Sequence, residues 1–329
     1  MNKKITDLET LIKTDYDNIA GIVVMHGGEK VYEGYFDGYT AGDAIHIASV
    51  TKSVVSALIG IAIDKGYIKS INQKILEFFP DYTVKRGEKS IQRVSIKNML
   101  TMTAPYKYKS EPYTKVYTSD DWTKAALDLL GGKGDFEGFN YSTIGIQILS
   151  EILVKATGQS LLAFATKNLF DPLGIKAPHN AFVHCKEDYM AFLKDRYVRG
   201  WVVDPKGTNT GGWGLAITPR DMAKIGQLYL NGGTWNGEQL LSSKWIEDST
   251  KENSQCGELS YGYLWWILDN KQKGCYAALG DGGNAIFVNN EKEIVIAIAS
   301  RFMPRAKNRI ELIEKHIVPL FENSQSDVR

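Results

Sequence analysis

A serine and a lysine three positions apart, Ser49 and Lys52, are the residues whose types and spacing most directly suggest chemistry. If a helix begins near Ser49, the two side chains lie on one face, one turn apart. A serine hydroxyl becomes an effective nucleophile when a base takes its proton, and a lysine does this once its own pKa is lowered. A helix N-terminus and the apolar run 54–63 would both disfavour a positive charge on Lys52. The same N-terminus would offer backbone N–H groups to an oxyanion.

An ordinary structural role fits the same pair, with Ser49 as the helix N-cap and Lys52 on the surface. Ser-x-x-Lys spacings arise by chance in long chains. This chain contains only one, and it runs directly into the strongly apolar segment 54–63. The pair is therefore the first candidate for a catalytic site.

Composition and charge limit the classes of function. The 329-residue chain has 43% hydrophobic and 23% charged residues, which is ordinary for a soluble globular protein. Its net charge of +1, without a basic block, argues against nucleic acid or a membrane as a partner. Cys185, Cys256 and Cys275 form no C-x-x-C pair, which indicates reduced thiols and neither a disulfide framework nor a zinc site. Asp7 and Glu9 interrupt the N-terminus before an apolar segment develops, unlike a signal peptide, so we expect a cytoplasmic location.

Patterning predicts strands near both ends of the chain and helices between them. Apolar positions at helical spacing predict a helix near 3–14, and strand-like segments at 21–25 and 30–36 are joined by a turn at 26–29. The expected helices of the middle segment lie near 94–103, 120–130, 141–157, 160–169, 218–231 and 242–251. Further strands and a final amphipathic helix are expected at 261–267, 275–279, 285–289, 293–299 and 305–321.

This order of elements predicts an α+β fold. We expect one antiparallel β-sheet flanked by the N- and C-terminal helices, built from residues 1–65 and 256–329. Residues 66–255 would form a mainly helical second lobe, with the active site between the lobes. The tyrosine-rich segment 104–119 has no periodicity, and it fits a binding loop and a solvated loop equally well. Segment 176–215 is similarly irregular.

A serine–lysine site also needs a proton shuttle and a second oxyanion donor, and two later segments offer them. The Tyr141 hydroxyl, placed beside Lys52, would exchange protons with Ser49 and the leaving group, although a half-buried structural aromatic fits as well. Segment 279–284 is typical of a glycine-rich hairpin turn. It would also let a substrate lie against a strand edge, while the N–H of Asn284 completes an oxyanion hole with that of Ser49.

Together, in this order, these segments resemble the serine β-lactamase and penicillin-binding-protein family. The nearest branch is the class C type, with its family VIII esterases and 6-aminohexanoate-oligomer hydrolases. Ser49-Val-Thr-Lys52 matches the Ser-x-x-Lys motif, Tyr141-Ser-Thr143 the Tyr-x-Asn/Ser motif, and 280–284 occupies the place of the Lys/His-Thr/Gly-Gly strand motif. Further segments along nearly the whole chain follow the family pattern, at 145–158, 169–175, 211–222, 230–237 and 261–266.

The resemblance implies a two-lobe β-lactamase-like fold and assigns the catalytic roles. Ser49 would attack the carbonyl, and Lys52 and Tyr141 would act together as general base and then general acid. The oxyanion and substrate-binding set would comprise Thr143, Asp281, Gly282, Gly283 and Asn284. The resemblance calls for no metal and no cofactor, and it leaves the oligomeric state open.

Two positions depart from the family pattern. Thr143 stands where the family usually has Asn, which helps to hold the substrate amide and the lysine. Asp281 stands where Lys or His usually helps to bind a substrate carboxylate. A carboxylate there would repel an anionic β-lactam by about 1 kcal/mol or more, which favours an uncharged or cationic substrate end.

The sequence therefore predicts a serine hydrolase that acts through an acyl-enzyme on a small-molecule ester or amide, as a carboxylesterase or amidohydrolase. Two alternatives stay open. The first is a β-lactamase or D-alanyl-D-alanine carboxypeptidase. The second is a non-catalytic binding protein on the same scaffold.

Overall fold

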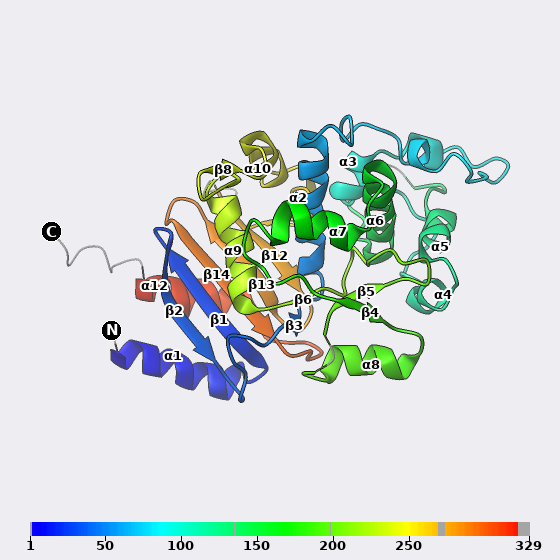
Figure 1. Ribbon diagram of the computed structural model, residues 1–329. Coiled ribbons are helices and arrows are strands. Elements are labelled where there is room, and N and C mark those ends of the chain that lie inside the picture. The colour runs from blue at the N-terminus through cyan, green and yellow to red at the C-terminus, as the bar shows by residue number, and fades with distance from the viewer. Residues whose placement is uncertain (1, 135, 198, 269–273, 322–329) are drawn as a thin grey trace.

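An eight-stranded antiparallel sheet organises the computed structural model, which describes residues 2–134, 136–197, 199–268 and 274–321 (Figure 1). The strands follow one another across the sheet in the order β2-β1-β14-β13-β12-β11-β10-β9. Their bounds are β1 Ile19–His26, β2 Glu29–Tyr35, β9 Ser254–Cys256, β10 Leu259–Tyr261, β11 Trp266–Ile267, β12 Cys275–Gly280, β13 Asn284–Asn289 and β14 Ile294–Ser300. The pairing of β1 with β14 joins the two chain ends in one sheet, so the predicted α+β fold is confirmed.

Helices from the two chain ends cover one face of this sheet. They are α1 (Asn2–Asp15) and the C-terminal α11 (Arg309–Leu312) and α12 (Val318–Phe321), with the π-helical turn η4 (Ile313–Ile317) between the last two. Leu8 and Ile12 of α1 share an apolar core with Ile22, Ile296 and Ile313. Both faces of the central strands are covered, and β14 is therefore buried along its whole length without an alternation of polar residues.

The opposite face packs against α2 (Val50–Asp64) and α9 (Pro219–Leu230). Figure 1 shows α9 in front of the sheet and α2 toward its right edge. Gly226 lets α9 approach closely, because a Cβ atom there would lie 2.5 Å from Val295 Cγ1. Helix α9 belongs to the segment 66–255 that the sequence assigned to the helical lobe, yet it contacts β1, β13 and β14. The domain limits stay a prediction, with this helix lying on the sheet.

The helical lobe is built around α6 (Thr143–Thr157), which packs against α2, α3 (Ile96–Leu100), α5 (Trp122–Leu129) and α7 (Leu161–Ala165). Ser142 caps α6 through its Oγ, which accepts the Gly145 N–H at 2.8 Å, and Gly158 ends it with a φ of 68°. The remaining elements are β3 Ile45–His46, η1 Ile75–Phe78, η2 Ile91–Arg93, α4 Tyr113–Tyr117, η3 Thr166–Phe170, β4 Asn180–Phe182, α8 Lys186–Lys194, β5 Trp201–Val203, β6 Ala216–Ile217, β7 Thr234–Trp235, β8 Glu238–Gln239 and α10 Ser243–Ser249.

The structure differs from the predicted elements in a few places. The expected strand 261–267 is two strands, because the chain turns between β10 and β11, with Leu264 at a φ of 62°. The expected helix 305–321 begins only at Arg309 and contains a π-helical turn. Helix α8 lies in a segment that was expected to be irregular. Phe192 is its one buried residue, so the helix has no apolar stripe that a sequence pattern could reveal.

Within the described ranges, no single helix is long and apolar enough to cross a membrane. Helix α6 and the segment Leu161–Phe170 meet that test only when joined across a bend of 75°. Cys185, Cys256 and Cys275, all within the described ranges, are reduced thiols outside any disulfide bond.

Candidate active site

Ser49 lies directly before the first residue of α2, and the chain enters the helix through a strained turn. The preceding residue, Ala48, has a φ of 49°, a left-handed conformation that costs an alanine about 1 kcal/mol. The Ser49 side chain makes no capping hydrogen bond to the helix. Its Oγ instead accepts a hydrogen bond from Lys52 Nζ at 2.8 Å. The structure therefore argues against Ser49 as a simple N-cap.

Lys52 is not a surface residue, since only 1% of it is exposed. Its Nζ contacts three oxygen atoms: Ser49 Oγ at 2.8 Å, Thr143 Oγ1 at 3.2 Å and the Gly212 carbonyl oxygen at 2.7 Å. Three acceptors match the three hydrogens of an ammonium group. In the described part of the chain, Lys52 forms no ion pair with a carboxylate. This arrangement holds Nζ within hydrogen-bond distance of Ser49 Oγ, as proton exchange between the two would require.

Tyr141 lies beside this pair and presents its ring to the lysine. Lys52 Nζ lies 4.8 Å from the centroid of the phenol ring. The ring is half-buried and stacks on Trp266, with centroids 6.1 Å apart and an interplanar angle of 19°. Among the described residues the Tyr141 hydroxyl has no hydrogen-bond partner, so the expected contact between this hydroxyl and Lys52 is not formed here.

Thr143 is the first residue of α6, and the N-terminus of this helix is bound by the carboxylate of Glu111. The sequence did not indicate this role for Glu111. Glu111 accepts hydrogen bonds from the Ile144 N–H at 2.8 Å, from Ser142 Oγ at 2.9 Å and from the Tyr113 hydroxyl at 2.6 Å. A carboxylate is favourable at a helix N-terminus, where N–H groups point outward. Glu111 lies 33 positions before Ile144, within the tyrosine-rich segment, so no local pattern marks it.

The glycine-rich turn after β12 approaches the nucleophile through Gly280. A Cβ atom on Gly280 would overlap the Ile47 carbonyl oxygen and lie 3.1 Å from Ser49 N. Only glycine lets the strand come this close. The Gly280 carbonyl accepts the Gly283 N–H at 3.1 Å, on the β13 side. Because the peptide bond between Gly280 and Asp281 is trans and planar, the Asp281 N–H points to the other side.

This leaves two backbone donors near the nucleophile. Within the described ranges, neither the Ser49 N–H nor the Asp281 N–H donates a hydrogen bond to the protein. Two unpaired N–H groups beside a serine nucleophile form the arrangement that an oxyanion needs.

Asn284 occupies a different position from the one expected. It is the first residue of β13, pairs with Gly280 and is 2% exposed, so the ladder directs its backbone into the sheet. Its Nδ2 donates to the Asp281 carbonyl at 2.8 Å, and its Oδ1 accepts the Ser300 N–H at 2.9 Å. Asn284 therefore lies behind the turn, and we assign the second oxyanion donor to the Asp281 N–H.

The rim of the site carries one exposed carboxylate and several aromatic side chains. Asp281 is exposed and has no ion-pair partner in the described part of the chain. Gly282 and Gly283 continue the turn, with φ angles of 79° and 86°. Tyr189 of α8 faces Asp281, and its pKa is raised first by burial and then by that carboxylate. Tyr113, 47% exposed, stands on the side of the helical lobe.

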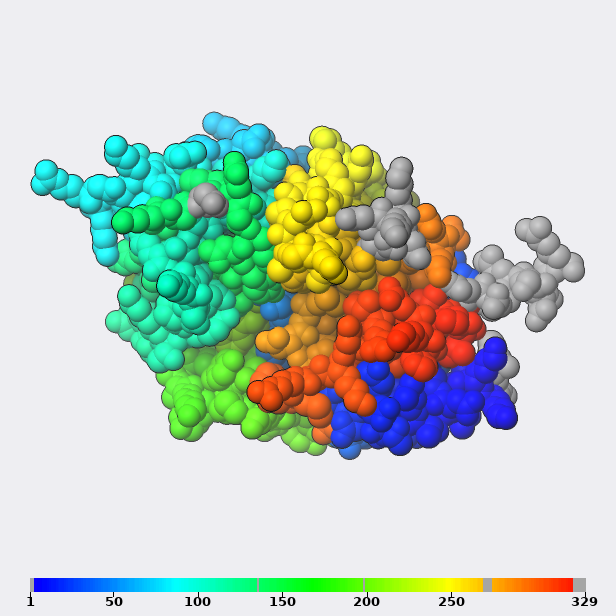
Figure 2. Space-filling model, turned by 180° about the vertical axis from the view of Figure 1, so that it is seen from behind, coloured from blue at the N-terminus to red at the C-terminus, as the bar shows by residue number. Residues whose placement is uncertain are grey.

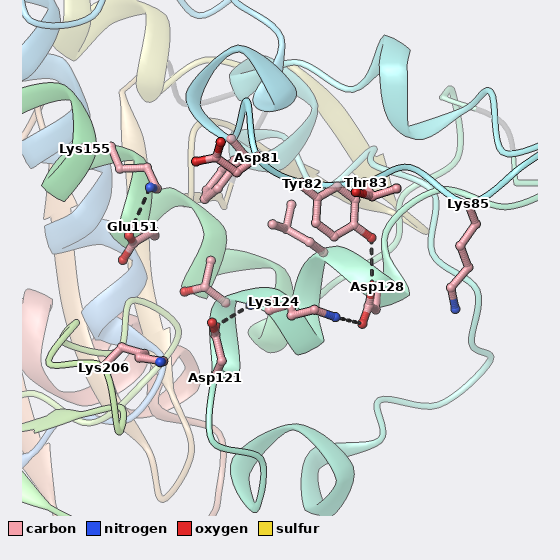
Figure 3. A pocket seen from close by; sticks show the side chains of 13 residues that line it. Asp81, Tyr82, Thr83, Lys85, Asp121, Lys124, Asp128, Glu151, Lys155 and Lys206 are labelled. Carbon is pink, nitrogen blue, oxygen red and sulfur yellow. Dashed lines mark hydrogen bonds and ion pairs between the residues drawn. The ribbon is translucent and has the colours of Figure 1, made fainter.

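A separate cavity of about 470 Å³ lies away from this site, between α5, α6 and segment 79–85 (Figure 3). Neither Ser49 nor Lys52 lines it. Figure 3 shows two of its cations paired with acids, Lys124 with Asp128 at 2.8 Å and Lys155 with Glu151 at 3.8 Å. Its charges are balanced, and we assign it no ligand.

Comparisons with known proteins show what this chain is similar to. A family model described as Beta-lactamase matches residues 8–316. The chain is 24% identical over 300 residues to a 6-aminohexanoate-dimer hydrolase of Paenarthrobacter ureafaciens, covering 83% of this chain and 70% of that protein. An octameric penicillin-binding protein homologue from Pyrococcus abyssi superposes with a TM-score of 0.71 and 20% identity, over 96% of this chain and 76% of the other. A penicillin-binding protein homologue from Caulobacter crescentus gives 0.66 and 16%, over 92% and 91% of the two chains.

Proposed function

The chain belongs to the beta-lactamase family of serine hydrolases, and we propose that it forms an acyl-enzyme on Ser49 with small esters or amides. One observation carries the proposal: Ser49 Oγ lies 2.8 Å from the Nζ of the buried Lys52. A nucleophile and a base in hydrogen-bond contact are the minimum for covalent catalysis of acyl transfer. A non-catalytic binding protein has no need to keep a buried lysine in this contact.

The proposed reaction proceeds in two steps. Lys52 first releases one proton, keeps its N–H bonds to Gly212 and Thr143, and turns its lone pair to Ser49. It then takes the Ser49 proton while Oγ attacks the substrate carbonyl, and the N–H groups of Ser49 and Asp281 donate to the oxyanion. Loss of one such donor typically costs about 3 kcal/mol of transition-state stabilisation. The intermediate collapses as the leaving alkoxide or amine takes a proton from Lys52, with the nearby Tyr141 hydroxyl as its relay. A water molecule then repeats the sequence on the acyl-enzyme and releases the acid.

Asp281 supports a substrate whose end near the turn is neutral or cationic. Its exposed carboxylate lies next to the proposed oxyanion donor and would repel an anionic group there. This favours an esterase or amidase over a β-lactamase or D-alanyl-D-alanine carboxypeptidase. The name of the Paenarthrobacter relative, a dimer hydrolase of 6-aminohexanoate, supports including amides. The cytoplasmic location stays a prediction.

Parallel assays of two substrates test the proposal. We expect the wild type to hydrolyse a short-chain p-nitrophenyl ester, Ser49→Ala to lose that activity, and a chromogenic cephalosporin to be turned over slowly at most. Fast, Ser49-dependent cephalosporin turnover would support the β-lactamase alternative. Turnover of neither substrate, with no labelling of Ser49 by a phosphonate, would support the binding-protein alternative.

A further inference from the structure

Every carbonyl group of the turn 280–283, which carries the Asp281 N–H, accepts a hydrogen bond. Four consecutive carbonyl oxygens, from Gly280 to Gly283, accept a hydrogen bond. In chain order, their donors are the Gly283 N–H at 3.1 Å, Asn284 Nδ2 at 2.8 Å, Asn18 Nδ2 at 2.7 Å and Ser300 Oγ at 3.2 Å. A turn whose carbonyl groups are all bound on one side has little freedom to rotate its peptide planes.

Two of the residues behind this turn come from opposite ends of the chain. Asn18 precedes β1 and is 3% exposed, and Arg309 begins α11 and is 4% exposed. Arg309 Nη2 donates to Asn18 Oδ1, which directs Asn18 Nδ2 toward the Gly282 carbonyl. The same Nη2 lies 3.5 Å from the Gly282 oxygen. Figure 2 shows the N-terminal segment, in blue, against the C-terminal segment, in orange to red.

Arg309 is a buried cation without an acidic partner. It forms no ion pair in the described part of the chain, and its Nε has no hydrogen-bond partner. Burial lowers its pKa to about 10. A Cβ atom on Gly283 would lie 2.6 Å from Arg309 Nε, so the guanidinium packs directly against the glycine turn. Burying an unpaired charge is costly, and a methionine would fill the same space without that cost.

We propose that Asn18 and Arg309 are positioning residues that aim the Asp281 N–H at the oxyanion, an inference that rests on the proposed function. Arg309 orients Asn18, and Asn18 fixes the Gly282 carbonyl on the far side of the turn. The N–H of that same peptide, from Gly283, donates to the Gly280 carbonyl at 3.1 Å. The Gly280–Asp281 peptide is thereby held with its own N–H on the opposite side, toward Ser49. A donor held in place before the reaction stabilises the transition state without reorganisation at the moment of attack.

Two variants test the proposal without removing a catalytic group. Asn18→Asp keeps an acceptor for Arg309 but loses the donor to the Gly282 carbonyl and to the Arg301 carbonyl. Arg309→Met keeps much of the volume but loses the hydrogen bonds to Asn18 Oδ1 and to the Gly282 and Lys307 carbonyl oxygens. Arg305→Met is the matched control, because Arg305 is exposed in the same loop and bonds to no carbonyl of the turn. Arg309→Lys restores the charge and one donor.

The readouts are kcat and KM for a p-nitrophenyl ester, inhibition by phenylboronic acid, and the melting temperature. The boronate adduct on Ser49 is tetrahedral and places an oxygen in the oxyanion hole. We expect Asn18→Asp and Arg309→Met to lower kcat about tenfold to hundredfold with little change in KM. Boronate affinity should fall by a similar factor, Arg309→Lys should recover part of both losses, and Arg305→Met should behave as wild type.

A purely structural role predicts a different result. The variants would then melt earlier, while kcat and boronate affinity per folded molecule stay within about twofold of wild type, and the proposal would be overturned. If Arg309→Met does not fold, Asn18→Asp and Arg309→Lys decide by the same criteria. A wild type with no esterase activity and no Ser49 labelling would overturn the proposed function and this inference together. An active wild type with unaffected variants would overturn this inference alone.

Discussion

Lys52 Nζ and the Gly212 carbonyl oxygen lie 2.7 Å apart, although 160 positions separate the two residues in the chain. The Gly212 carbonyl and Thr143 Oγ1 each accept one hydrogen bond from Nζ, and the third hydrogen-bonding position of Nζ faces Ser49 Oγ. The loop that carries Gly212 is held in turn by His46, whose Nε2 accepts the Gly214 N–H at 3.2 Å. The direction of the lysine therefore depends on segments far from the Ser-x-x-Lys motif.

Thr143→Val should lower kcat/KM for a p-nitrophenyl ester by about tenfold, because Lys52 loses an acceptor worth roughly 1 to 1.5 kcal/mol. Valine keeps the shape of threonine, so the melting temperature should change little. Thr143→Ser, which keeps the hydroxyl, is the control and should retain most of the activity. Equal activity of Val and Ser variants would mean that the contact between Thr143 and Lys52 has no catalytic role.

Gly280→Ala should lower esterase activity by about a hundredfold or more, since the added methyl group meets the Ile47 carbonyl and Ser49 N. A backbone carbonyl cannot rotate away as a flexible side chain does. Gly42→Ala is the matched control, because a Cβ atom there has no neighbour within 4 Å. Steady-state kinetics and thermal melting of both variants give the comparison, and full activity of Gly280→Ala would contradict the close approach of the turn to Ser49.

His46 should make the protein less stable in acid. Burial against Phe192 and Trp213 lowers its pKa from 6.5 to about 3, so the unfolded state binds more protons between these values. The His46 contribution is present above about pH 6.5 and is lost as the pH falls toward 3, by at most about 1.4 kcal/mol per pH unit. Urea unfolding from pH 7.5 to 4.5 should show this dependence reduced in His46→Gln. The exposed His316→Gln should keep the wild-type slope, and parallel slopes for His46→Gln and wild type would refute the assignment.

Glu111→Gln should destabilise the fold by about 1 to 3 kcal/mol, because a charged acceptor of several hydrogen bonds at the start of α6 becomes a neutral amide. Chemical denaturation measures the difference. Glu258→Gln, at an exposed position, should change the free energy of unfolding by less than about 0.5 kcal/mol. Equal stability of the two variants would show that Glu111 is dispensable for α6.

The fold was largely predictable because its elements carry local signals. The short apolar runs with β-branched residues at 21–25 and 293–299 predicted strands, and these segments lie in β1 and β14. Short elements without an apolar stripe, such as α8, carry no such signal. The break between β10 and β11 depends on the left-handed conformation of Leu264, which sequence periodicity does not reveal.

The candidate site was predictable where its residues are neighbours in the chain. Ser49 and Lys52 are three positions apart, and one helical turn brings them together. The roles of Glu111 and Gly212 arise from contacts across 33 and 160 positions, which no local pattern encodes. The expected donor Asn284 is three residues from the amide that we assign as the second oxyanion donor, because only the pairing of β12 with β13 shows on which side of the turn each residue lies.

The most direct test of the central claim is to locate a covalent adduct on Ser49. After reaction with a p-nitrophenyl phosphonate, trypsin cleavage after Lys30 and Lys52 releases residues 31–52, a peptide in which Ser49 is the only serine. Ser53 and Ser56 fall in the next peptide, so the two locations are separated by mass spectrometry. We expect one phosphonyl group per chain on residues 31–52, located on Ser49 by fragmentation and absent from Ser49→Ala. An unlabelled protein that still hydrolyses the ester, or a label on residues 53–65, would contradict it.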